Sequence, residues 1–95
     1  MISFSFKTTE ETYAYCEDIV ACLQNYFNYS QKESVELINK FWIDLPDFDE
    51  YDYRLHENTY YWAVAIHLKS QNKYTPQWWK DKSLWPPPQD YLQRT

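Results

Sequence analysis

Apolar side chains recur at three- and four-residue steps after a polar start near residue 9, the spacing of an amphipathic helix. Thr8 and Glu11 fit a capping box, in which a hydroxyl and a carboxylate bind the first free amides of a helix. Asn28 tolerates a positive φ and can end the run. We therefore expect a first helix over about 9–28.

A second helical pattern begins shortly afterwards. Ser30 and Glu33 form another capping box, and apolar residues continue at helical spacing until Pro46, which cannot lie inside a helix. This pattern predicts a helix over about 31–44.

Residues 59–68 are apolar on every side, which is typical of a central, buried element. A buried strand is the alternative, because Tyr, Trp, Val and Ile also favour sheets. We prefer a helix over about 54–70, since Ala63 and Ala65 are strong helix formers and the only strand-like segment, 2–6, has no further partner.

From about residue 70 onward the helical spacing of apolar residues ends, and Trp and Pro become frequent. Thr75 and Pro76 suit the start of a short helical turn over about 76–81, whereas the triple proline 86–88 favours an extended, polyproline II path over about 84–90. We expect this Trp- and Pro-rich segment to wrap the helical core; an aromatic ligand site is the alternative.

Together these elements predict an all-α fold, a small bundle of three to four helices. Ninety-five residues are too few for two cores, so residues 1–95 form a single domain. The expected core is Ile19, Val20, Leu23, Phe27, Ile38, Phe41, Trp42, Trp62, Ile66 and Leu68.

Composition narrows the classes of function. The chain has no Gly, which removes the phosphate-binding loops of nucleotide enzymes. Its net charge of -5, from 14 acidic and 9 basic residues, argues against nucleic acid or an anionic membrane as a partner. No leader pattern or long apolar run is present, and Cys16 and Cys22 are spaced too far apart on one helix for a disulfide. We expect a cytoplasmic protein with reduced core thiols.

Candidate catalytic groups are few. His56, Glu57 and His67 could be written as a metal or acid–base cluster, but on one continuous helix the two histidines would lie about 16 Å apart, and only a break near Asn58 would bring them closer. Both cysteines lie on a predicted helix whose periodic apolar spacing indicates core packing and not a catalytic thiol. We therefore expect no metal, no cofactor and no enzymatic activity.

Charge is concentrated in one window. Residues 44–58 contain six acids and one Arg, a formal -5, whereas residues 59–95 sum to +3. Within residues 44–58, aromatic residues alternate with carboxylates. Aromatic residues anchor protein interfaces, and clustered charge accelerates association with an oppositely charged partner. The alternative is a solvated loop whose aromatic residues fold inward. The expected partner-binding residues of this acidic segment (residues 47–57) are Asp47, Asp49, Glu50, Tyr51, Asp52, Tyr53 and Glu57. Because exposed charges contribute little to stability, we expect joint neutralisation of Asp49, Glu50 and Asp52 to leave the fold intact.

The acidic, aromatic-rich helical pattern over residues 9–70, with Tyr60 and Tyr61 following Glu57, resembles small bacterial immunity proteins of nuclease colicins and of contact-dependent or polymorphic toxins. The resemblance implies an inhibitor that occludes a basic toxin domain. The glycine-bearing motif around the tyrosine pair of colicin immunity proteins is missing, so the pair is not carried over as a binding site. A small structural or adaptor subunit of a bacterial complex is the alternative; the sequence leaves the oligomeric state open.

Overall fold

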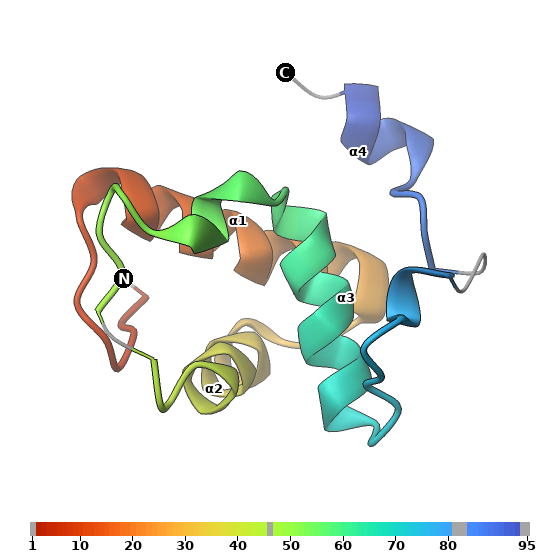
Figure 1. Cartoon of the computed structure of the whole chain (residues 1–95), viewed down its shortest axis with the longest axis horizontal. Helices are drawn as coiled ribbons and strands as arrows, with labels where there is room; N and C mark the ends of the chain where they lie inside the picture. The colour runs from red at the N-terminus through yellow and green to blue at the C-terminus, as the bar shows by residue number, and fades with distance from the viewer. Residues whose placement is uncertain (1, 46, 81–83, 94–95) are drawn as a thin grey trace.

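The computed structural model describes residues 2–45, 47–80 and 84–93, and within them the fold is all-α, as predicted. Four α-helices follow one another along the chain, and two short 3-10 turns lie between them; no strand occurs in these ranges (Figure 1). The elements are α1 (Glu10–Phe27), α2 (Gln31–Phe41), η1 (Tyr53–His56), α3 (Thr59–Ser70), η2 (Trp78–Lys80) and α4 (Gln89–Gln93).

Helix α1 starts and ends close to the predicted positions, but its capping residue is different. Thr9, not Thr8, caps the helix, and its partner in the capping box is Thr12. Thr8 instead pairs in an isolated bridge with Phe48, which keeps its backbone extended. At the other end Asn28 adopts the expected left-handed conformation, with φ 62°.

Helix α2 begins at the predicted capping box, in which Ser30 and Glu33 each accept the other's backbone amide. It ends at Phe41, three residues before the predicted end. The indole of Trp42, the C-cap residue, is buried in the core, while the next residue, Ile43, is 72% exposed. The backbone therefore leaves the helical path directly after Trp42. Pro46 lies outside the described residues.

Helix α3 is the central helix, and the alternative of a buried strand is wrong. It begins at Thr59 rather than near residue 54, because the Asn58 side chain accepts the Tyr61 amide at 2.7 Å and caps the helix there. Residues 53–56 form the separate turn η1.

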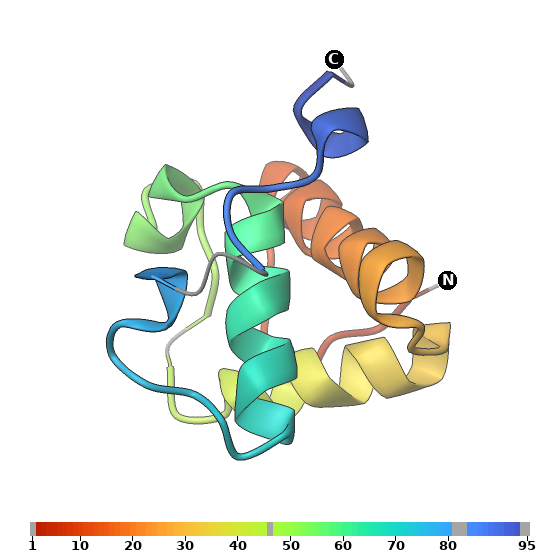
Figure 2. The ribbon, with the colours of Figure 1, turned by 90° about the vertical axis from the view of Figure 1, so that its right-hand side faces the viewer.

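Figure 2 shows α1, α2 and α3 along three sides of a triangle that encloses the core. Eight of the ten predicted core residues are buried; Phe27 and Phe41 are partly buried and pack against the others. Further side chains complete the core: Cys16 and Cys22, the expected core thiols; Ala63 and Val64 of the predicted buried element; and Phe48 and Tyr91.

The C-terminal segment differs from its prediction. The turn η2 lies within the predicted 76–81, of which residue 81 is outside the described residues. The predicted extended stretch 84–90 is interrupted at residue 89, where the short helix α4 begins. Trp78 and Tyr91 are buried, and the Tyr91 hydroxyl lies 2.7 Å from the Thr59 hydroxyl at the start of α3. The Trp85–Pro86 peptide bond is cis. Wrapping of the whole segment around the core stays a prediction.

Candidate functional site

The acidic segment runs alongside α1 and is fixed at one end by Phe48 (Figure 1). The Phe48 ring is buried against Trp42 and Tyr15, and its amide donates to the Lys7 carbonyl at 2.8 Å. The Thr12 hydroxyl donates to the Phe48 carbonyl at 2.9 Å. This residue therefore ties the segment both to the backbone at Lys7, which precedes α1, and to α1 itself.

The second fixed point is Arg54, a cationic side chain that is only 1% exposed. Its Nε and Nη2 donate to the two carboxylate oxygens of Asp52 at 2.9 and 2.7 Å, and its guanidinium lies over the rings of Phe48, at 4.0 Å, and Trp42, at 4.8 Å. The Arg54 hydrogen bonds hold the pKa of Asp52 below its usual range. The buried charge is thus balanced by a carboxylate and by aromatic faces.

Hydrogen bonds also hold the backbone at Arg54. The Trp62 indole donates to the Arg54 carbonyl at 2.9 Å, and the Tyr15 hydroxyl lies between this carbonyl, also at 2.9 Å, and that of Glu57. Burial raises the pKa of Tyr15, so the hydroxyl keeps its proton and remains a donor.

Two tyrosines project from the segment near these fixed points. Tyr51 is 87% exposed and Tyr53 is 63% exposed, whereas most other aromatic side chains that the structure describes are buried or partly buried. The Asp49 carboxylate accepts the Tyr51 amide at 2.9 Å and shapes the turn that presents it. Glu50 is exposed next to it.

The predicted site residues therefore divide into two groups. Tyr51 and Tyr53 are exposed, together with the carboxylates of Asp47, Asp49, Glu50 and Glu57. Asp52 belongs to the internal ion pair, so its carboxylate is occupied. The expectation that a triple neutralisation including Asp52 spares the fold therefore needs correction, because the change would remove the counter-charge of a buried guanidinium. Phe48, another aromatic residue of the segment, is buried, as the alternative of a loop with inward-folded aromatic residues predicted.

Sequence reasoning missed part of the charged surface. Glu10 and Glu11, in the first turn of α1, line a shallow depression together with Thr9 and Glu50. Carboxylates from two segments about forty residues apart thus share one patch. The pair Glu10–Glu11 was visible as the start of a helix, but no local pattern places it beside Glu50.

The histidines lie in separate surroundings. His56 is exposed in η1, whereas the His67 ring stacks on Phe27 at a centroid distance of 4.5 Å, and its Nδ1 lies 2.8 Å from the Tyr29 hydroxyl. Burial, with Lys73 nearby, lowers the pKa of His67. The chain does break at Asn58, yet among the described residues no three His, Cys, Asp or Glu side chains gather closely enough to hold a metal ion.

The tyrosine pair of the immunity-protein resemblance is largely internal. Tyr60 is buried and its hydroxyl donates to the Leu84 carbonyl at 2.9 Å; Tyr61 is half-buried against Trp78. These contacts assign both rings to packing of the C-terminal segment.

No protein-family model, curated protein or solved structure matches this chain. In the ranges that the structure describes, every helix is too short or too polar to cross a membrane.

Proposed function

We propose that this protein acts by binding, as a toxin-neutralising immunity protein whose acidic segment covers the basic active site of a bacterial toxin domain. The observation that carries the proposal is the presentation of Tyr51 and Tyr53, two exposed rings on a segment fixed in the core by Phe48 and Arg54. A small structural or adaptor subunit remains the alternative.

A segment fixed in this way is suited to binding because little backbone has to be ordered when a partner arrives. Tyrosine is enriched among residues that dominate interface energies, since its ring buries a large area and its hydroxyl still forms a hydrogen bond. Tyr51 and Tyr53 are the proposed anchors of the interface.

The surrounding carboxylates supply the second element of the mechanism. Asp47, Asp49, Glu50 and Glu57 are exposed, and Glu10 and Glu11 add charge beside Glu50. Clustered negative charge accelerates encounter with a basic surface and disfavours acidic partners. In this proposal the carboxylates accelerate association with the partner, and the tyrosines stabilise the bound complex. Asp52 keeps the segment in place through its ion pair with Arg54.

The test begins with the protein that co-purifies with this chain from its native cell in moderate salt. For the complex with that protein, association should slow clearly at about 0.5 M salt, where the Debye length falls to about 4 Å. Y51A/Y53A should raise the dissociation rate and leave the association rate nearly unchanged. D49N/E50Q should mainly lower the association rate.

The control variant is E17Q/E36Q, which removes two exposed carboxylates from other parts of α1 and α2. It should behave as the wild type. Expression of the partner alone should arrest growth, and co-expression of the wild type, but not of Y51A/Y53A, should relieve the arrest. A partner that causes no growth arrest would favour the adaptor function, and unchanged kinetics in both variants would exclude this surface as the interface.

A further inference from the structure

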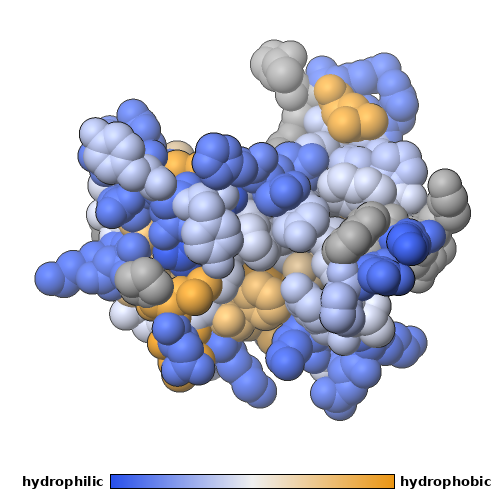
Figure 3. Space-filling model, viewed as in Figure 1, coloured by the Kyte–Doolittle hydropathy of each residue, from blue (hydrophilic) through white to orange (hydrophobic). Residues whose placement is uncertain are grey.

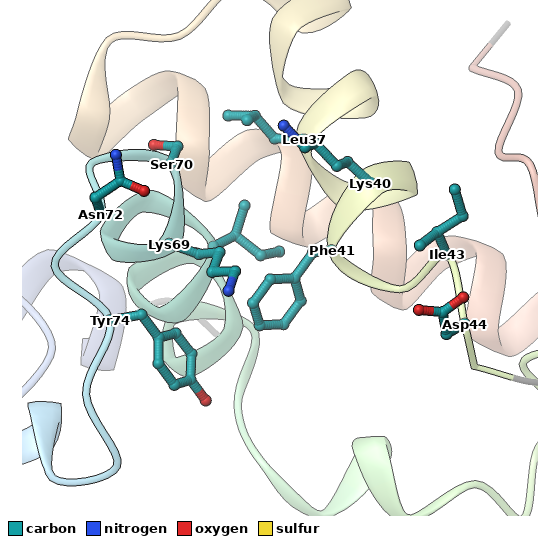
Figure 4. A pocket seen from close by; sticks show the side chains of 10 residues that line it. Leu37, Lys40, Phe41, Ile43, Asp44, Lys69, Ser70, Asn72 and Tyr74 are labelled. Atoms are coloured by element: carbon teal, nitrogen blue, oxygen red, sulfur yellow. The ribbon is translucent and has the colours of Figure 1, made fainter.

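A groove of about 680 Å³ lies between α2 and α3, formed by side chains from both helices and from the chain after them (Figure 4). Leu37 and Phe41 provide apolar surface in it, the buried Ile66 also lines it, and Tyr74 flanks it. Figure 3 shows apolar surface gathered in this region of the molecule. The volume is in the range of sites that bind ligand groups.

The groove carries positive charge in a negative protein. Lys40 from α2 and Lys69 from α3 line it; both are exposed, and neither forms an ion pair with any residue in the described ranges. One acid, Asp44, also lines the groove, next to Ile43 and away from Lys69 and Tyr74 (Figure 4). An apolar group flanked by carboxylates would therefore complement it in shape and charge.

The chain itself presents such a group. Tyr51 is 87% exposed, and the carboxylates of Asp49 and Glu50 lie on its N-terminal side. We infer that the acidic segment of one copy docks on the groove of a second copy, with Tyr51 against Phe41 and Tyr74 and with Glu50 facing the two lysines.

The contact should be weak and reversible. One aromatic anchor buries about 150–250 Å², well below the roughly 1,200–2,000 Å² that stable interfaces bury. Repulsion between copies of net charge -5 also opposes association, although at physiological salt it is largely screened beyond about 8 Å, whereas ion pairs partly buried in the contact are screened much less. Self-association would cover the same tyrosine that we propose for partner binding, so a bound partner should displace the second copy.

Sedimentation velocity from about 10 µM to about 1 mM, the range of weak complexes, tests the inference. The average mass of the wild type should rise with concentration. Y51A and K40E/K69E should stay monomeric over the same range, whereas Y51F, which keeps the ring, should associate. K32E/K80E makes the same change in net charge outside the groove and should associate far more than K40E/K69E.

A complementation experiment identifies the contact itself. E50K alone and K40E/K69E alone should both be monomeric, because like charges meet in each. In a mixture, the altered segment of E50K can dock on the altered groove of K40E/K69E. The unaltered segment of K40E/K69E can likewise dock on the unaltered groove of E50K. Opposite charges face each other in both contacts, so one-to-one complexes should form again.

A monomeric wild type at about 1 mM would overturn the inference, as would association that none of these variants changes. If the chain stays monomeric but binds a synthetic peptide of residues 47–53 through the two lysines, the groove serves a segment of another protein instead. The inference needs only the exposure of the segment, so binding of a toxin partner without self-association would leave the proposed function standing.

Discussion

The Asp52 side chain caps the turn η1 and forms an ion pair with Arg54, and replacement by Asn separates these two roles. Asn is as good a capping residue as Asp, so the acceptor for the Arg54 amide at the start of η1 is kept. What disappears is the negative charge, together with the oxygen that accepts the Arg54 Nη2 hydrogen bond at 2.7 Å, because the amide nitrogen of Asn cannot accept it. The variant thus tests the buried ion pair alone.

The expected cost follows from the burial of the two groups. The Arg54 side chain is 1% exposed and that of Asp52 is 10% exposed. Removal of one partner from a buried pair costs about 3–5 kcal/mol, because the remaining charge is left in a medium of low polarity. Since water still reaches part of Asp52, we expect about 3 kcal/mol, a large share of the stability of a small domain.

Urea unfolding followed by circular dichroism and tryptophan fluorescence measures this cost. Asp49→Asn is the matched control, since Asp49 caps its own turn through the Tyr51 amide but faces no buried cation; it should cost less than about 0.5 kcal/mol. The double variant D52N/R54M should recover much of the loss, because an apolar side chain replaces the unpaired charge. A cost for D52N equal to that of D49N would refute the argument.

Three further outcomes are expected. Trp62→Ala should lower the free energy of unfolding in urea by about 3–5 kcal/mol, because it leaves a cavity and removes the hydrogen bond to the Arg54 carbonyl. Because the folded protein lowers the pKa of His67, its contribution to stability is present above the usual value of 6.5 and is lost as the pH falls below it; His67→Gln should flatten this part of the stability profile. Burial raises the pKa of Cys16 to about 12, so alkylation by iodoacetamide near neutral pH should occur only through the unfolded state, and urea that populates this state should accelerate it.

The helices were predictable because their signals are local. The Ser30–Glu33 capping box and the left-handed Asn28 act within one turn of backbone, and periodic apolar positions act within two. The acidic segment was likewise visible from the alternation of carboxylates and aromatic rings. These features require no knowledge of what lies opposite in space.

The tertiary structure alone decided which members of that segment face outward. Phe48 and Tyr51 look alike in the sequence, yet Phe48 is buried because the Thr12 hydroxyl, 36 residues away, binds its carbonyl and the rings around it close the core. Arg54 is a single basic residue among six acids in the sequence, and only the structure shows that Trp42 and Phe48 provide the aromatic faces that make its burial favourable. The groove between α2 and α3 has the same origin, since it exists only where two separate helices meet. Such contacts depend on segments that are distant in sequence, and a local pattern carries no information about them.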